Sequence, residues 1–120
     1  MYLCLMKVHK YRKVITYKSY FKEFFKSQSI AVQMKIIWTL ELIEDIEQIP
    51  RTYLKHLTGT DGLYEIRVSL GSNTYRVFCF FSGKQLVVLM NGFQKKTQKT
   101  PESELLKALK IKEGYEQENK

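Results

Sequence analysis

The stretch from Leu63 to Thr100 carries three apolar runs that alternate with polar positions. The runs are rich in Val, Phe, Tyr and Leu, and they are separated by Gly-Ser-Asn at 71–73 and Ser-Gly at 82–83, which are turn residues. Alternation with a period of two is typical of β-strands. The pattern therefore predicts a three-stranded antiparallel meander with a tight first turn and a two-residue second turn.

Parity within the meander assigns its side chains to two faces, because successive residues of a strand point to opposite sides. Every second residue of the first two strands contributes to one apolar face: Tyr64, Ile66, Val68, Leu70, Tyr75, Val77, Cys79 and Phe81. Glu65, Arg67 and Arg76 have the opposite parity. We therefore expect the two arginines to stand together on neighbouring strands, on the face away from the core.

Lysines follow the third strand in the run QKKTQKT, at positions 95, 96 and 99. Together with the arginines they predict a basic cup on a small sheet. Phe78 and Phe80 share the parity of Arg76, so either a helix covers that end of the face or the aromatic rings form a stacking surface. Cover by a helix is the simpler interpretation.

Helical periodicity precedes the meander. Residues 18–28 place Tyr20, Phe21, Phe24 and Phe25 at helical spacing, which predicts an amphipathic helix. A second, denser apolar stripe covers residues 30–49 and predicts a helix that Ser29 caps and Pro50 ends. The two helices are expected to form a hairpin that buries one face of the sheet.

The remaining segments complete the expected fold. Residues 11–17 are read as a first strand, and residues 50–62 as a connector that carries Lys55 and His56. Thr100 and Pro101 start a closing helix whose apolar face is Leu105, Ala108 and Leu109. We expect a single domain over residues 1–120, with 1–10 as a leader of uncertain structure and 113–120 as a frayed tail. The fold class is α+β: a helical hairpin on a small antiparallel sheet of about four strands, with a C-terminal helix.

Composition and charge narrow the possible partners. The chain has 120 residues and a formal net charge of +8, which favours a polyanion such as nucleic acid. Cys4 and Cys79 show no metal-ligand spacing and no disulfide framework, so we read both as free thiols in a reducing cytoplasm. The N-terminal apolar stretch is too short for a signal peptide, and we expect no membrane span, no metal and no cofactor.

Three strings of the meander, LYEIR, TYRVFCFF and NGFQKKTQKTP, resemble the toxin family typified by RelE and HigB, most closely its phage-derived HigB-like branch. The resemblance covers roughly residues 11–112 and is dense from 63 to 108. It implies a RelE-like fold and a small toxin that a cognate antitoxin neutralises, with a HigA-like helix-turn-helix protein as that antitoxin. Most such toxins cut mRNA, usually on the ribosome and without a metal, whereas a related branch poisons DNA gyrase.

The resemblance also implies roles for single residues. Arg76 matches the arginine that stabilises the transition-state phosphate, and Arg67 matches a basic position of the preceding strand. Lys95 or Lys96 matches the basic position after the last strand. Glu65 stands where some members carry a lysine as general base. Residues 97–100 show no clear match to the aromatic residue or histidine that others place just beyond the last strand.

Metal-free RNA cleavage requires a base for the 2′-hydroxyl, cations for the phosphate and an acid for the leaving 5′-oxygen. Glu65 is either that base or a salt-bridge partner that holds Arg67 or Arg76 in place, and we favour the salt bridge. Lys95 or Lys96 acts as the acid only if neighbouring cations lower its pKa. His56 acts as acid or base only if it reaches the edge of the cup. Side chains expected to bind RNA are Lys55, His56, Lys95, Lys96 and Lys99.

The residues and the resemblance together lead to one expected function and one alternative. We expect an endoribonuclease toxin that cleaves mRNA in the cytoplasm. The alternative is a protein that binds without cleaving, either a gyrase poison of the related branch or an RNA-binding phage protein.

Overall fold

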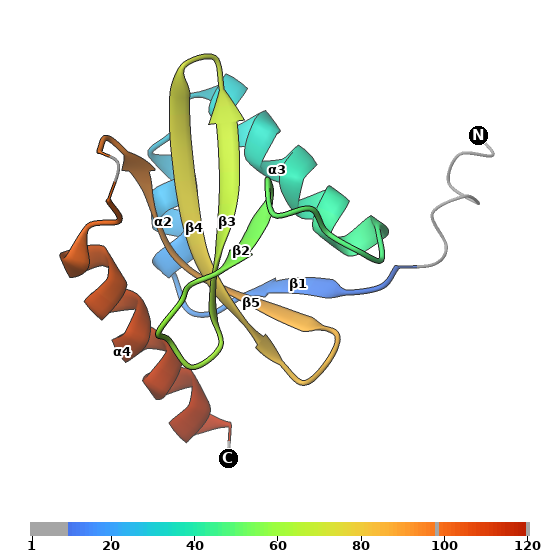
Figure 1. Cartoon of the computed structure of the whole chain (residues 1–120), viewed down its shortest axis with the longest axis vertical. Coiled ribbons are helices and arrows are strands. Elements are labelled where there is room, and N and C mark those ends of the chain that lie inside the picture. Colours follow the sequence, from blue (N-terminus) through green and yellow to red (C-terminus); the bar gives the residue numbers. More distant parts are fainter. Residues whose placement is uncertain (1–9, 98, 120) are drawn as a thin grey trace.

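A computed structural model describes residues 10–97 and 99–119 and shows a mixed sheet between two helical layers (Figure 1). Its elements, in chain order, are β1 (Lys13–Thr16), α2 (Tyr20–Lys26), α3 (Ile30–Asp45), β2 (Leu54–His56), β3 (Leu63–Leu70), β4 (Asn73–Ser82), β5 (Leu86–Lys95) and α4 (Glu102–Glu118). The α+β class, the helical hairpin and the C-terminal helix are confirmed.

Within the described residues the sheet has five strands in the order β1-β5-β4-β3-β2, rather than about four, and it is not wholly antiparallel. The extra strand is β2, in the expected connector, and three residues are too few to show an alternating pattern. Strand β1 pairs in parallel with β5, with Val14 opposite Val87. Local periodicity carries no information on the direction in which strands distant along the chain pair.

Helices α2 and α3 cover one face of the sheet. Every second residue of the central strands points to this face, and these residues are apolar. The buried cluster includes Ile66, Val77 and Leu89 from the strands and Ile36 and Ile43 from α3. This is the core predicted from parity. The close approach of α2 to β5 depends on Gly92, because a Cβ there would lie 2.6 Å from the Phe24 ring.

The end of α3 lies four residues before the expected one. The helix stops at Asp45, and the backbone of Ile46 is extended. Arg12, which precedes β1, donates hydrogen bonds to the carbonyl oxygens of Ile43, Ile46 and Glu47. A cation at a helix C-terminus satisfies the last carbonyls and complements the helix dipole, so Arg12 ends the helix before Pro50 can. The start is as predicted, since the Ser29 hydroxyl accepts from the Val32 amide at 3.3 Å.

Helix α4 covers part of the opposite face. Phe78 and Phe80 are buried beneath it, so the interpretation of helical cover is confirmed. Ala108 and Ile111 form the buried side of α4, whereas Leu109, expected on that side, is 38% exposed. The helix begins after Pro101, without the side-chain cap expected from Thr100.

The last turns of α4 are helical through Glu118, in the region where we expected a frayed tail. The Tyr115 ring packs edge-on against Phe80 and Tyr17, with centroids 5.2 Å apart in each pair. Burial of this aromatic ring stabilises turns that are polar in sequence. The leader was expected over residues 1–10; residues 1–9, which include Cys4, lie outside the described part, whereas Lys10 is described and pairs with Glu44 and Asp45.

The two hairpin turns have different lengths. Gly71 and Ser72 join β3 to β4, and Gly71 has a φ of 62°, which a two-residue hairpin turn requires. Three residues, 83–85, join β4 to β5, in place of the two expected. No helix within residues 10–97 and 99–119 combines the length and the apolar character needed to cross a bilayer.

Candidate functional site: a basic cup on the open half of the sheet

The half of the sheet that α4 leaves uncovered carries most of the charged residues singled out from the sequence. Strand register places Lys55 opposite Glu65, Arg67 opposite Arg76, and Thr74 opposite Lys95. Directly opposed residues share a face of the sheet. Four cations thus surround one carboxylate, and the name basic cup is used below for this group: Lys55, Glu65, Arg67, Arg76 and Lys95.

Glu65 holds the two arginines together. Its Oε1 accepts a hydrogen bond from Arg67 Nε at 3.3 Å and lies 3.3 Å from Arg76 Nε, in an ion pair without hydrogen-bond geometry. Like charges directly opposite on neighbouring strands repel, and a shared carboxylate offsets that repulsion. Both arginine side chains therefore converge, as predicted, and the salt-bridge interpretation of Glu65 agrees with the geometry.

Burial distinguishes the two arginines. The side chain of Arg67 is 28% exposed and that of Arg76 only 10%. Burial, more than its neighbours, lowers the pKa of Arg76; the charge of Arg67 also lowers it, and Glu65 opposes the shift. A guanidinium nevertheless stays protonated in proteins. Arg76 is thus a poorly hydrated, fixed cation, held also by a hydrogen bond from Nη1 to the Tyr75 carbonyl at 3.1 Å.

Unmet hydrogen-bonding capacity is concentrated in the same place. Glu65 is 2% exposed, and its Oε2 has no protein hydrogen-bond partner. The Nε of Arg76 is also without a hydrogen bond. Buried polar atoms normally find partners, so these two atoms mark the cup as a place where the protein's own hydrogen bonding is incomplete.

Lys95 enters the cup because of an irregularity in strand pairing. Val77 pairs with Gly92 and Cys79 with Leu89, so β5 has one residue more than β4 over this interval. Such a β-bulge reverses the parity of the strand beyond it. Before the bulge, Val88 and Met90 face α4; after it, Phe93 and the residue two positions on, Lys95, share that face.

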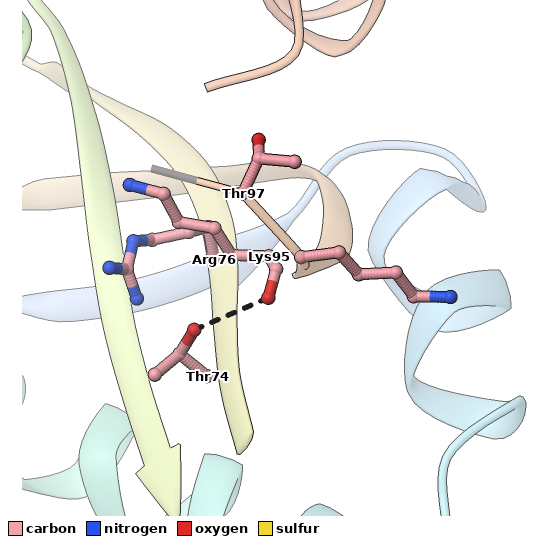
Figure 2. A pocket seen from close by; sticks show the side chains of 5 residues that line it. Thr74, Arg76, Lys95 and Thr97 are labelled. Carbon is pink, nitrogen blue, oxygen red and sulfur yellow. Dashed lines mark hydrogen bonds between the residues drawn. The ribbon is translucent and has the colours of Figure 1, made fainter. Parts of the chain in front are cut away.

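The environment of Lys95 makes it a better acid than an ordinary lysine. Partial burial lowers its pKa most, and the nearby charge of Arg76 lowers it further. Arg67 and Lys55 act in the same direction, while Glu65 opposes them. Figure 2 shows the side chains of Arg76 and Lys95 extending in the same direction, with the Thr74 hydroxyl 3.5 Å from the Lys95 carbonyl oxygen.

Beside these side chains lies an open hollow of about 460 Å³, lined by Thr74, Arg76, Lys95, Lys96 and Thr97 (Figure 2). Cations and hydroxyl groups at its wall are the groups that bind phosphate oxygens. Thr74 and Thr97 were not singled out from the sequence. Thr74 has the parity of Arg76, so strand alternation could have predicted its place beside Arg76. Thr97 lies beyond the end of the strand, where alternation predicts nothing.

Other residues named from the sequence lie outside the cup. His56 pairs with Tyr64, with ring centroids 5.1 Å apart, and Tyr64 packs on the core beneath α2 and α3. His56 is therefore on the opposite face of the sheet and does not reach the cup edge. Lys96 is exposed at the hollow, and Lys99 is exposed in the loop before α4, where its carbonyl accepts from the Thr97 hydroxyl at 2.9 Å.

Asn91 connects the bulge to α4. Its side chain is almost fully buried, and Nδ2 donates to the carbonyl oxygen of Glu104 at 3.2 Å and to Glu104 Oε1 at 2.9 Å. The first turn of α4 is therefore attached to β5 four residues before Lys95. This contact fixes both ends of the loop 96–101, which carries Lys96 and Lys99.

The described cysteine lies away from the cup. Cys79 lies in the core on the other face, and burial raises the pKa of its thiol. In the part of the chain that the structure describes, no three His, Cys, Asp or Glu side chains gather as a metal ion would require.

Comparison with known families identifies the chain. The sequence model of the family described as phage-derived protein Gp49-like matches residues 23–113, which include α3, strands β2 to β5 and most of α4. A comparison with curated proteins found no match. The match covers most of the chain and the whole basic cup. The chain therefore belongs to the phage-derived Gp49-like family, a family of RelE/HigB-like toxins associated with toxin–antitoxin systems.

Proposed function

We propose that this chain is the toxin of a toxin–antitoxin pair and that it cleaves mRNA, bound on the ribosome, at the basic cup. The observation that carries the proposal is the convergence of Arg67 and Arg76 on one carboxylate beside an open hollow. Family membership supports the toxin role, and the cup supports the chemistry.

The phosphate is bound by the arginines. A guanidinium presents a planar set of donors that matches two phosphate oxygens, and a poorly hydrated guanidinium interacts more strongly than one in water. Arg76 is the more buried of the pair, so it is assigned to the oxygen that gains charge as the 2′-hydroxyl attacks phosphorus. Arg67 supports it from the neighbouring strand.

Lys95 is assigned as the acid. The 2′-hydroxyl gives its proton to water as its oxygen bonds to phosphorus, the bond from phosphorus to the 5′-oxygen breaks, and Lys95 Nζ transfers a proton to that oxygen. The products are a 2′,3′-cyclic phosphate and a 5′-hydroxyl. The condition set from the sequence, a lysine pKa lowered by neighbouring cations, is met at Lys95, with burial as the larger cause.

Glu65 is assigned to holding the arginines rather than to general-base catalysis. Its Oε1 lies 3.3 Å from the Nε of both arginines, so this oxygen is engaged by the groups that it positions. Glu65→Gln separates the two roles. If Glu65 only positions the arginines, the glutamine of the variant keeps one acceptor oxygen and the variant keeps part of the activity. If Glu65 is the base, the variant loses the activity, because an amide does not accept the proton.

The decisive experiment follows cleavage of an mRNA on programmed ribosomes by the purified chain. The expected products carry 2′,3′-cyclic phosphate and 5′-hydroxyl ends. Arg76→Ala should lower the cleavage rate about 10²- to 10³-fold, as loss of one preorganised donor does. Arg51→Ala is the matched control, because Arg51 is exposed and follows α3, outside the cup. Equal rates for Arg76→Ala and the unchanged chain would refute the assignment.

One observation supports the alternative of binding without cleavage. His56 lies on the opposite face, so the described part of the cup contains no imidazole. If the double variant Arg67→Ala, Arg76→Ala still arrests growth and the unchanged chain yields no RNA ends, the protein acts as a binder, with gyrase as the target to examine.

The partners follow from the same proposal. A cytoplasmic toxin of the HigB-like branch requires an antitoxin, expected to be a HigA-like helix-turn-helix protein. The net charge of +8 favours both mRNA and an acidic surface on the antitoxin. Co-expression with the product of the adjacent gene should restore growth, and failure of every neighbouring gene to do so would contradict this pairing.

A further inference from the structure

Helix α3 has an apolar face on its solvent side. Ile30 is 74% exposed, Met34 65%, Ile37 46% and Trp38 44%. Scattered exposed apolar residues need no explanation, but a contiguous group on one helix commonly marks a contact surface. Trp38 also packs edge-on against Tyr53, with ring centroids 5.8 Å apart, which fixes its position at the margin of this face.

The spacing of these residues is that of a helix with two packing faces. The buried residues of α3 are Val32, Ile36, Thr39 and Ile43, and they face the sheet. The exposed set Ile30, Met34, Ile37 and Glu41 follows the steps four, three and four, which is the spacing of a coiled-coil seam. The name α3 seam is used below for this set of four. It lies on the side of the helix opposite to the core.

The α3 seam is symmetric about its centre. The midpoint between Met34 and Ile37 is also the midpoint between Ile30 and Glu41. If a second copy packs antiparallel, the partner's Ile37 meets Met34, and the partner's Glu41 meets Ile30. In a two-fold interface, a residue i that contacts residue j of the partner implies that residue j also contacts residue i of the partner. The α3 seam meets this condition.

Charge selects the antiparallel arrangement over the parallel one. The first turn of α3 has no acidic residue, so none of its side chains complements the N-terminal end of the helix dipole, whereas Arg12 complements the C-terminal end from outside the helix. In a parallel pair the two Glu41 carboxylates would lie side by side and repel. In an antiparallel pair each Glu41 lies beside the partner's helix N-terminus, where free backbone amides favour a negative charge.

We propose that two copies of this chain associate through the α3 seam, as an antiparallel helix pair around a two-fold axis that passes between Met34 and Ile37. Trp38 flanks the α3 seam and becomes buried on association. The basic cup lies on the face of the sheet away from α3, so both cups stay open in the dimer. The proposal does not depend on the proposed function.

The small area of the α3 seam limits the affinity between the two copies. One helix face presents less than the roughly 800 Å² per partner of a standard interface. The dimer is therefore concentration-dependent, with a dissociation constant in about the micromolar range. Sedimentation of the full chain over about 1 to 300 µM should show the mass rising from 14.3 kDa towards twice that value. A mass of 14.3 kDa at every concentration overturns the proposal.

Substitutions in the α3 seam test whether the two copies touch there. Met34→Glu with Ile37→Glu should return the chain to a monomer at all these concentrations, and circular dichroism should show unchanged folding because both residues are exposed. Leu106→Glu with Leu109→Glu is the matched control on the outer face of α4, where these leucines are 55% and 38% exposed. A dimer that survives the first pair and is lost with the second overturns the proposal.

Two further experiments test the antiparallel arrangement of the helices and the burial of Trp38. In chains whose Cys4 is replaced by Ser, a mixture of Met34→Cys and Ile37→Cys should form mixed disulfides faster than either variant alone. Faster bonding within one variant would indicate a parallel or different contact and overturn the antiparallel geometry. Trp38 is the single tryptophan of the chain, so its emission should shift to the blue as concentration rises. An unchanged spectrum while the mass doubles would place the interface elsewhere.

Discussion

The two faces of the sheet use the same alternation of side chains for different purposes. Towards α2 and α3, the alternating residues of β3 and β4 are apolar along their whole length and belong to one core. On the other face the apolar residues stop at Leu63 and Phe78, and Glu65, Arg67 and Arg76 take their place. Helix α4 covers the apolar half and leaves the charged half open.

The difference shows how a small fold makes a site without an internal cleft. Burial of charges is costly unless they are paired and hydrogen-bonded, so a charged half-face excludes a covering helix. The apolar half binds α4, and α4 in turn bounds the charged half. The boundary between Phe78 and Arg76 is therefore both the limit of the second core and the edge of the basic cup.

Removal of an aromatic anchor from the covered half should have the largest effect. Phe78 is fully buried beneath α4, and Phe78→Ala should lower the free energy of unfolding by about 3–5 kcal/mol. Urea denaturation followed by circular dichroism measures this. Leu106→Ala, on the exposed side of α4, is the control and should change stability by less than about 0.5 kcal/mol. Equal losses would show that α4 is not anchored by its buried side.

A pair of glycine substitutions contrasts the core of α2 and α3 with the outer surface. Gly92→Ala should cost about 1–3 kcal/mol, because its Cβ meets the Phe24 ring at 2.6 Å. Gly114→Ala should stabilise by about 0.5–1 kcal/mol, because it lies within α4 and its Cβ finds only the Tyr17 hydroxyl, at 3.6 Å. Thermal melting gives both values. An unchanged melting temperature for Gly92→Ala would contradict the close packing assigned to Gly92.

The pH dependence of cleavage tests Lys95. The protonated amine is the acid, so the rate should fall as pH rises through the pKa of Lys95, which lies below the ordinary lysine value of 10.5. In Lys95→Arg this alkaline limb should disappear, because a guanidinium does not deprotonate in that range. Lys84→Arg, in the exposed turn before β5, should keep the limb of the unchanged chain. An unaltered limb in Lys95→Arg would assign it to another group.

The smallest effect is expected for an exposed lysine beside the cup. Lys99→Ala should weaken RNA binding only a few-fold and reduce the slope of log affinity against log salt by about 0.7, which corresponds to one phosphate contact on a single strand. Lys84→Ala should leave the slope unchanged. Fluorescence anisotropy with a short single-stranded RNA, at several salt concentrations, measures both slopes. A slope unaffected by Lys99→Ala would place the RNA away from the loop.

Alternation in the sequence was sufficient to predict which arginines meet. Arg67 and Arg76 lie on long strands joined by a two-residue turn, and a short turn leaves little freedom of register. The same local signal predicted the core beneath α2 and α3 and the cover over Phe80. It failed for β2, for the parallel pairing of β1, and for the position at which Arg12 ends α3, because each depends on residues distant in the chain.

By itself the sequence determined the elements of the meander, the sign of the charge on its open face and the pair of guanidinium groups at its centre, since these follow from local period and short connections. Only the tertiary structure decided that Lys95 rather than Lys96 enters the cup and that His56 does not, and that one carboxylate holds both arginines. The physical reason is the bulge in β5. A single extra residue reverses strand parity, and its position is set by how β5 packs between β4 and α4 rather than by any period in the chain.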